Sequence, residues 1–277
     1  MKDRAYAKIN LALDVFNVRA DGYHDIRSIM VPVNFYDELE IRISDKDEFV
    51  CNRSYIKLNE HNSIIKMINV FREKYSITDH YCIKLNKCIP TQAGLGGGTS
   101  DAGSALRLLK KMYQINLGAE EEKQVCVAVG ADVLFNYYNR PAVVEGIGDI
   151  VSPFEIRKQY SVLLVKPYKG ISTKEAYDLL DMSICDHPDI DVLKKALENG
   201  DDITGLMGNS LEQPSLILNN DVKKIKDLLI DNGAANVLMS GSGSTVFAIS
   251  EDTDEIVRLN KLVENRGYFT RLTKTLK

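Results

Sequence analysis

The sequence lacks several features that would assign a function class at once. It contains no tryptophan and only four histidines, and its 35 basic residues are outnumbered by 39 acidic ones, giving a net charge of -4. A chain with this charge has no broad basic surface for a nucleic-acid backbone, so no nucleic-acid partner is expected. Any phosphate group that it binds must be held locally, by backbone N–H groups or by a single lysine.

Cysteine motifs and long apolar runs are also missing. The five cysteines cannot all pair, and neither a CxxC motif nor a Cys/His cluster with zinc spacing occurs, so free thiols in a reducing compartment are expected. No apolar run approaches the roughly 20 residues of a membrane span. Lys8, Asn10 and Asp14 interrupt the amino-terminal stretch, which therefore does not resemble a signal segment. We expect a cytoplasmic protein without a membrane partner.

Length and patterning indicate the fold class. A chain of 277 residues corresponds to about two domains at roughly 150 residues each. Hydrophobic residues make up 44% and charged residues 27%, which is typical of a globular protein. Segments with the helical spacing of apolar residues and segments with two-residue alternation follow one another irregularly along the chain. This order predicts a mixture of hairpin and crossover connections between strands. We interpret the chain as α+β, with one domain over residues 1–152 and a second over residues 153–277.

Residues 5–16 predict the first strand. Apolar side chains alternate with polar ones, which predicts one buried face and one polar face. Lys8 and Asn10 both fall on the polar face, about 6–7 Å apart along the strand. The sequence thus places an ammonium and an amide side by side.

Residues 90–101, PTQAGLGGGTSD, are unlike the rest of the chain. Four glycines within five positions follow a predicted strand at 81–87 and precede a helical pattern that begins near Thr99 or Ser100. Accessible N–H groups at a helix start favour anions, and glycine lets the backbone approach them. The stretch is not a P-loop, because no lysine follows the glycines, and not GxGxxG, because Thr99 replaces the third glycine. The plainer alternative is a flexible turn with Ser100 as the N-cap.

A second small-residue loop, SGSGST, occupies residues 240–245 between predicted strands at 236–239 and 245–249. One interpretation is a simple hairpin connection. The other is a wall of small residues that lets substrate phosphates pass close to the backbone.

Taken together, these segments resemble the GHMP kinases. The stretch AGLGGGTSDA at residues 93–102 is similar to the phosphate-binding motif of that family, and SGSGSTVF at 240–247 is similar to its carboxy-terminal glycine motif. The segments AKINL at 7–11 and RADGYH at 19–24 are similar to members that phosphorylate a cytidine-linked acceptor, as are GADV at 130–133 and GNSLE at 208–212. One departure is Leu134, where many such members have proline.

The resemblance implies a two-domain architecture with the active site in the cleft. The amino-terminal domain is expected to be like ribosomal protein S5 and the carboxy-terminal domain to be a ferredoxin-like α/β domain. ATP with Mg²⁺ is the implied phosphoryl donor. The implied acceptor is a small-molecule, cytidine-diphosphate-linked polyol that is phosphorylated on its 2-hydroxyl. The chain is expected to be a monomer or a weak homodimer.

Site residues are implied position by position. The catalytic pair is Lys8, the active-site lysine, and Asp132, the catalytic aspartate; no residue is assigned as a metal ligand. Nucleotide binding is implied for Asn62, which falls where the family contacts adenine, and for Pro90, Gly94, Leu95, Gly96, Gly97, Gly98, Thr99 and Ser100. Acceptor binding is implied for Asn10, Tyr23, His24, Thr173, Tyr177, Gly241, Ser242 and Gly243, with Tyr23 and Tyr177 sandwiching the cytosine ring and His24 hydrogen-bonding it.

Plainer interpretations of single residues remain open at this point. Asp132 is equally a turn residue, Lys8 a solvated side chain, Tyr177 a core residue, His24 a loop residue and Asn62 a bare helix N-cap. Two other functions also remain. One is another GHMP kinase with a homoserine or mevalonate type of acceptor, and the other is a non-catalytic ligand-binding member.

Overall fold

The computed structural model of the protein describes residues 1–57 and 59–277, which pack into two compact units. Unit 1 consists of Met1–Ala7, Phe35–Pro90 and Gly96–Asn139, and unit 2 of Lys8–Asn34, Thr91–Leu95 and Arg140–Lys277. The chain passes between them within strands β1 (Lys2–Val18) and β2 (His24–Ser44), and again on each side of residues 91–95. The units therefore interleave along the sequence, and the single domain boundary near residue 152 stays a prediction.

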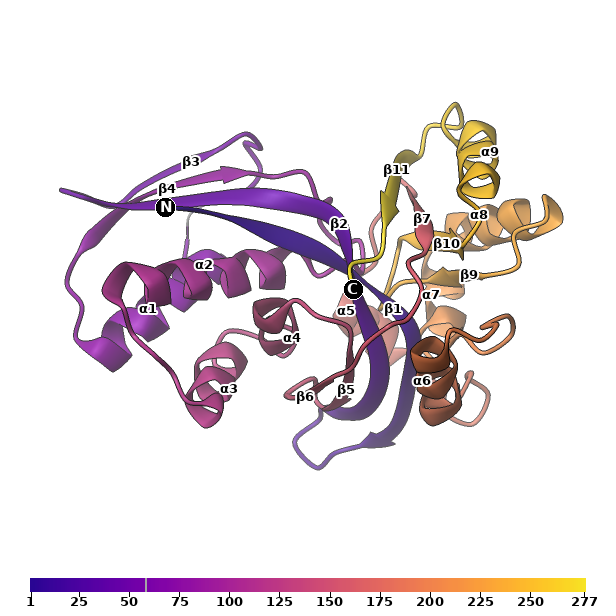
Figure 1. Ribbon diagram of the computed structural model, residues 1–277, viewed down its shortest axis with the longest axis horizontal. Helices are drawn as coiled ribbons and strands as arrows, with labels where there is room; N and C mark the ends of the chain where they lie inside the picture. Colours follow the sequence, from indigo (N-terminus) through magenta and orange to yellow (C-terminus); the bar gives the residue numbers. More distant parts are fainter. Residues whose placement is uncertain (58) are drawn as a thin grey trace. The chain divides into compact units, whose positions relative to one another are not determined.

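Unit 1 combines a sheet with helices. Strand β4 (His80–Asn86) pairs antiparallel with Glu38–Ser44 of β2 and parallel with β3 (Glu48–Cys51). The helices are α1 (Ser63–Tyr75), α2 (Gly97–Tyr113), α3 (Ala119–Val127) and α4 (Val133–Tyr138). Helices α1 and α2 lie side by side (Figure 1) and bury Met67, Phe71, Leu106 and Leu109. This apolar packing fixes α2, whose first turn carries the end of the glycine-rich stretch.

Unit 2 contains a second, antiparallel sheet with strand order β11-β7-β10-β9 among its described residues. These strands are β7 (Ser161–Lys166), β9 (Val237–Met239), β10 (Val246–Ser250) and β11 (Phe269–Lys274). The other elements are β5 (Ala142–Gly146), β6 (Ile150–Pro153), α5 (Thr173–Asp178), α6 (Ile190–Asn199), β8 (Gly208–Asn209), α7 (Glu212–Leu218), α8 (Asn220–Asp231) and α9 (Thr253–Val263). Strand β5 pairs with β2, and β8 pairs with β1.

The core of unit 2 lies between this sheet and helices α8 and α9 (Figure 1). Every second residue of β7 and β10 enters it, as in Leu163 and Val165, because side chains alternate across a strand. Helix α8 contributes Ile225 and α9 contributes Leu259 at helical spacing. The loop of residues 240–245 joins β9 to β10 and so starts from a rigid sheet edge.

Strand β1 differs from its expected burial. The alternation of residues 5–16 predicts one buried face and one polar face, but residues 7–13 are buried on both faces. Lys8 is 4% exposed and Asn10 is 1% exposed. The plainer alternative of Lys8 as a solvated side chain is therefore wrong, since period-two alternation does not show whether polar side chains contact water or one another.

Two helices also differ from expectation. Helix α2 begins at Gly97 rather than near Thr99 or Ser100, so its N-cap is Gly96 and Ser100 lies inside the helix. The Ser100 hydroxyl donates to the carbonyl of Tyr6 at 2.7 Å. Helix α4 was not predicted. Its last carbonyls, those of Asn136 and Tyr137, accept from Arg107 at 2.8 and 2.9 Å. A partner from another helix thus satisfies the end of this six-residue helix.

Across the described ranges, 1–57 and 59–277, the helices are too short or too polar to cross a bilayer.

His187 anchors the segment after α5 to β1. Its Nδ1 lies 2.6 Å from Oδ1 of Asp14 and its Nε2 lies 2.9 Å from the carbonyl oxygen of Met182. Neither of these oxygens carries a hydrogen when Asp14 is ionised, so both ring nitrogens donate in the imidazolium form. The Met182 carbonyl, followed by Asp14, raises the pKa of His187.

This anchor predicts a pH-dependent contribution to stability. A raised pKa stabilises the fold fully below about pH 6.5, and the contribution is lost as pH rises through the folded-state value. His187→Gln should therefore lower the free energy of unfolding at pH 6 more than at pH 9, by less than about 1 kcal/mol, because the pair is solvent-screened. Urea unfolding at both pH values measures the difference. Equal losses at both pH values for His187→Gln would contradict the assignment.

Candidate active site

The glycine-rich stretch ends in an open helix start. Gly96 adopts left-handed geometry (φ 66°) and is the N-cap of α2, a helix of 17 residues whose first N–H groups receive no side-chain cap from it. A Cβ on Gly98 would lie 3.4 Å from the hydroxyl of Ser63, so the first turn of α1 adjoins that of α2 within unit 1. Two helix amino termini side by side favour an anion, because their dipoles and free N–H groups add.

Thr99 is joined to the Asp132 segment within unit 1. The amide nitrogen of Asn136 donates to the Thr99 hydroxyl and to the carbonyl of Asp132, at 2.9 Å in both cases. A Cβ on Gly130 would lie 3.6 Å from the Thr99 methyl group. Asp132 itself is the N-cap of α4 and is partly exposed. The predicted phosphate loop and the predicted catalytic aspartate are thus brought together by residues of one unit.

Asn62 has the capping role that its position indicates. Its Oδ1 accepts from the N–H of Ile64 at 2.9 Å, so it is the N-cap of α1. Its amide group donates to the carbonyl of Lys57 at 3.2 Å. The cap is confirmed, and adenine contact stays a prediction; the two roles are compatible, because Asn62 and the start of α2 belong to the same unit.

Lys8 and Asn10 form a buried polar chain in unit 2. The Lys8 ammonium donates to Oδ1 of Asn10 at 2.7 Å, and the Asn10 amide donates to the Ser28 hydroxyl at 2.8 Å. The backbone N–H of Lys8 donates to the carbonyl of Leu95 at 3.0 Å. The predicted shared face is confirmed, and the backbone bond attaches β1 to the glycine-rich stretch.

The two glycine loops meet in unit 2 at Gly94. The Ser240 hydroxyl donates to the Gly94 carbonyl at 3.0 Å, and a Cβ on Gly94 would lie only 1.9 Å from the Ser240 carbonyl oxygen. A Cβ on Gly241 would lie 3.4 Å from the Lys8 ammonium. Residues 240–245 are therefore more than a hairpin connection, since they pack against residues 93–94 and Lys8.

Two contacts join pairs of predicted acceptor residues within unit 2. The hydroxyls of Thr173 and Ser242 lie 2.8 Å apart, which places the start of α5 against the second glycine loop. The rings of His24 and Tyr177 lie 4.8 Å apart at 41°. Tyr23 is 59% exposed. Tyr23 directly precedes His24 in the chain, and an exposed aromatic ring fits a site for a planar base, although base binding itself stays a prediction.

Several residues of the site were missed in the sequence. Asn136 and Ser28 hold predicted residues in place, and Asn209 donates to the carbonyls of Met239 and Gly241 at 2.8 and 2.9 Å. A buried Lys87 with two carboxylates was missed as well. The GNSLE segment gave a signal for Asn209, but the others carry no local pattern, because their partners are distant in sequence.

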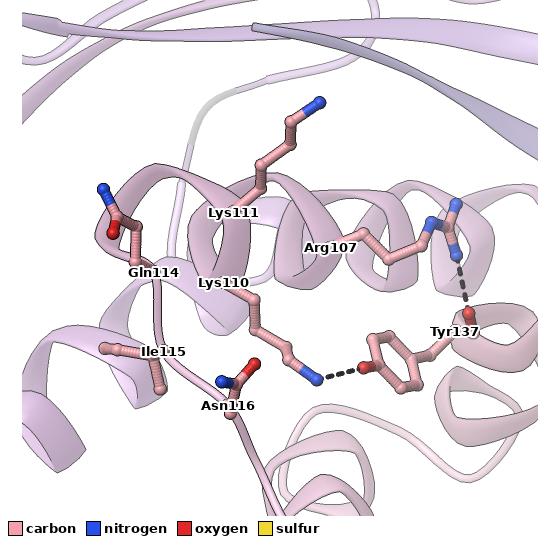
Figure 2. Close-up of a pocket in the computed structure, with 7 residues that line it drawn as sticks. All are labelled: Arg107, Lys110, Lys111, Gln114, Ile115, Asn116 and Tyr137. Atoms are coloured by element: carbon pink, nitrogen blue, oxygen red, sulfur yellow. Dashed lines mark hydrogen bonds between the residues drawn. The ribbon is translucent and has the colours of Figure 1, made fainter.

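The cavity in Figure 2 lies elsewhere in unit 1. It has a volume of about 450 Å³ and is lined by the carboxy-terminal half of α2 and by Tyr137, without any predicted site residue. Two of its three cations are engaged: Lys110 contacts Glu122 and the Tyr137 hydroxyl, and Arg107 contacts Asp3. The carboxy-terminal end of a helix also disfavours anions, so this cavity is not a phosphate site.

Comparison with known proteins defines the class. The family model described as "GHMP kinases N terminal domain" matches residues 62–140, and the one described as "GHMP kinases C terminal" matches residues 185–261. A crystal structure of homoserine kinase from Cytophaga hutchinsonii has a TM-score of 0.72 at 18% identity, over 98% of this chain and 94% of that one, which shows the same fold. The α+β, two-domain GHMP architecture expected from the sequence is confirmed.

Sequence relatives narrow the class further. The chain is 40% identical to 4-diphosphocytidyl-2-C-methyl-D-erythritol kinase of Clostridium beijerinckii, over 91% of each chain, and 37% identical to the enzyme of that name from Thermoanaerobacter pseudethanolicus, over 100% of this chain and 96% of the other. A crystal structure of 4-(cytidine 5'-diphospho)-2C-methyl-D-erythritol kinase matches all of both chains at 26% identity and a TM-score of 0.84. The chain therefore belongs to the GHMP kinase family, in the group of 4-diphosphocytidyl-2-C-methyl-D-erythritol kinases, whose members are ATP-dependent small-molecule kinases.

Proposed function

We propose that the protein transfers the γ-phosphoryl group of ATP to the 2-hydroxyl of 4-diphosphocytidyl-2-C-methyl-D-erythritol, giving the 2-phosphate and ADP, as a step of non-mevalonate isoprenoid precursor synthesis. The chemistry rests on two hydrogen bonds within unit 1, by which the Asn136 amide links Thr99 to the Asp132 backbone. They set a candidate proton acceptor beside an anion-binding helix start. The choice of acceptor is supported by relatives of that name that match nearly the whole chain.

The start of α2 fits the triphosphate of ATP. Glycines at 94 and 96 hold left-handed geometry (φ 71° and 66°), and Gly98 is exposed, so the backbone is open to phosphate oxygens. Among the described residues no group of three His, Cys, Asp or Glu could hold a metal. When bound, Mg²⁺ would be held mainly by the phosphate oxygens, with the hydroxyl of the partly exposed Thr99 as a protein ligand. Bound there, Mg²⁺ neutralises charge that develops on the phosphates.

Asp132 and Lys8 are assigned to the transfer step. The Asp132 carboxylate accepts the proton of the acceptor hydroxyl as the oxygen attacks the γ-phosphorus and the bond to ADP breaks. The Lys8 ammonium stabilises negative charge on the transferring group. Asn10 orients this ammonium through their 2.7 Å hydrogen bond, and Ser28 orients Asn10 in turn. Buried polar chains of this kind limit the freedom of the charged group.

Recognition of the cytosine base is assigned to Tyr23, His24 and Tyr177. Stacking on an aromatic ring contributes roughly 1–3 kcal/mol per base, and hydrogen bonds to the base edge exclude other bases. His24 already lies against Tyr177. Thr173 and the glycine loop at 241–243 are assigned to the rest of the acceptor, because Thr173 contacts Ser242.

An ADP-release assay tests the proposal. The full-length protein with Mg-ATP should release ADP with the cytidylated acceptor and not with the same polyol lacking the nucleotide, homoserine or mevalonate. Turnover on homoserine or mevalonate alone would show that the protein is a GHMP kinase with a different acceptor from the one proposed. A ligand-dependent rise in melting temperature with no ADP release from any acceptor would show a binding protein without kinase activity. A cytoplasmic location and a monomer or weak homodimer stay predictions beside this proposal.

Tyr177 provides a separate test of the cytosine site. Tyr177→Ala should raise the KM for the acceptor by roughly 10- to 100-fold through lost stacking and leave the KM for ATP within about twofold. Steady-state kinetics with each substrate varied in turn measures the split. Tyr177 also packs on the core of unit 2, so Tyr177→Leu, which keeps apolar volume, separates stacking from packing. If the leucine variant keeps the wild-type KM for the acceptor, Tyr177 is a packing residue.

A further inference from the structure

Unit 1 contains a buried charge cluster that the proposed chemistry does not use. The Lys87 ammonium lies 2.6 Å from Oδ2 of Asp37 and 2.6 Å from Oδ2 of Asp101. The exposed fractions of the three side chains are 4%, 0% and 5%. Charges buried this deeply cost free energy unless they pair, so a cluster of one ammonium and two carboxylates needs a structural or functional reason.

The cluster fixes both ends of the glycine-rich stretch. On the near side, Oδ1 of Asp37 accepts from the backbone N–H groups of Cys88 and Ile89, at 2.5 and 2.8 Å, directly before Pro90. On the far side, Asp101 belongs to the first turns of α2. One ammonium group therefore holds both ends of the stretch, through Asp37 at one end and Asp101 at the other. The whole loop lies between residues 88 and 101 in the chain.

Lys87 also limits where Gly97 lies. A Cβ on Gly97 would be 3.1 Å from the Lys87 ammonium and 2.9 Å from the Ile89 side chain, so the helix start sits directly on the cluster. Gly97 is the first residue of α2, and the N–H groups proposed to bind phosphate follow it. A displacement of the Lys87 side chain would therefore also displace these N–H groups.

In this cluster burial disfavours each charged form, and the attraction between the ammonium and the carboxylates favours it. Burial disfavours the charged form of Lys87, but the carboxylates of Asp101 and Asp37 outweigh it and hold the pKa of the ammonium above its ordinary value. Burial raises the pKa of Asp101 to about 7, against the attraction of Lys87. Oδ1 of Asp101 is buried and has no hydrogen-bond partner within the described ranges. Lys87 is thus the common centre on which both carboxylates are held.

We propose that Lys87, Asp37 and Asp101 are positioning residues that hold the first N–H groups of α2 in the geometry that binds the phosphates of ATP. The cluster acts through the backbone and touches neither substrate. The proposal rests on the proposed function, because it assigns the nucleotide to the start of α2. It is distinct from general stabilisation of unit 1, since it requires a selective effect on the nucleotide.

Asp101→Asn is the main variant. It keeps the side-chain volume and leaves the Lys87–Asp37 pair, so unit 1 is expected to fold. We expect the KM for ATP, and the Kd for ADP measured by calorimetry, to rise roughly 10- to 100-fold, as is typical when binding groups are displaced by about 1 Å. The KM for the acceptor should stay within about twofold. Lys87→Met removes the centre of the cluster and should give a larger effect of the same kind.

Glu122→Gln is the matched control. Glu122 pairs with Lys110 at 2.6 Å in the same unit, is mostly buried, and contacts α2 in its carboxy-terminal half. This variant should lower the melting temperature without changing either KM. The inference is overturned if Asp101→Asn changes both KM values alike or matches Glu122→Gln, or if neither cluster variant folds, which would make the cluster a folding requirement. Failure of the wild type to bind ADP would instead reject the proposed function.

Discussion

Asp132→Asn should lower kcat by roughly 10²- to 10⁴-fold while the KM for ATP changes little. The amide cannot accept the proton of the acceptor hydroxyl, and general base catalysis contributes about that factor. Asp132 is the N-cap of α4 with no side-chain cap hydrogen bond, and asparagine is an equally good N-cap residue. The substitution should therefore leave the fold intact. ADP release under saturating substrates, together with the melting temperature, measures both expectations.

A second N-cap aspartate provides the control. Asp252 caps α9 through a hydrogen bond from the N–H of Asp254, and no role in the reaction is assigned to it. Asp252→Asn makes the same chemical change at the same kind of position and should keep wild-type turnover. If Asp132→Asn also keeps wild-type turnover, Asp132 is only the start of α4 and another group accepts the proton.

Gly94→Ala should destabilise the protein by about 3 kcal/mol or more and abolish most turnover. A Cβ there would lie 1.9 Å from the carbonyl oxygen of Ser240 and 3.0 Å from the backbone nitrogen of Gly243. These are backbone atoms that cannot rotate away, and the φ of 71° is itself unfavourable for alanine. The two glycine loops must then separate, which displaces residues 240–243 from Lys8. Urea unfolding and ADP release measure the two effects.

Gly267→Ala separates backbone strain from collision. Gly267 has a similar φ of 79°, but a Cβ there would meet nothing within 4 Å. Its replacement should cost only the left-handed conformation, about 1 kcal/mol, and leave turnover unchanged. If both variants lose the same free energy of unfolding, the contact of Gly94 with Ser240 does not constrain the loop.

Elements with strong periodicity could be predicted closely. The helical spacing of apolar residues predicts helices at about 190–198 and 221–231, and the structure has them at Ile190–Asn199 and Asn220–Asp231. The strand predicted at 245–249 occupies Val246–Ser250. Their apolar residues recur at helical or strand spacing, and Asp189 and Asn219 cap the two helices with their side chains. Local sequence was sufficient for these elements, because their patterns and their end signals agree.

Helix α4 could not be predicted in this way. Its six residues, VLFNYY, are too short for a 3.6-residue repeat to be visible. Arg107 of α2 satisfies its last carbonyls, and the Asn136 side chain donates to the hydroxyl of Thr99. The helix therefore depends on partners that a local pattern does not contain. For this reason the helical backbone that follows Asp132 was not predicted from the sequence.

The sequence by itself determined the local backbone of the site and the family. Glycines at 94 and 96 allow positive φ, Asn62 caps a helix, and the order of the motifs identifies the GHMP kinases, since each of these depends on neighbouring residues alone. Only the tertiary structure decided that Lys8 is buried, that Gly94 lies against Ser240 and that Lys87 joins Asp37 to Asp101. These contacts join residues 14 to 146 positions apart. Burial and charge pairing over such separations arise only when the chain has packed.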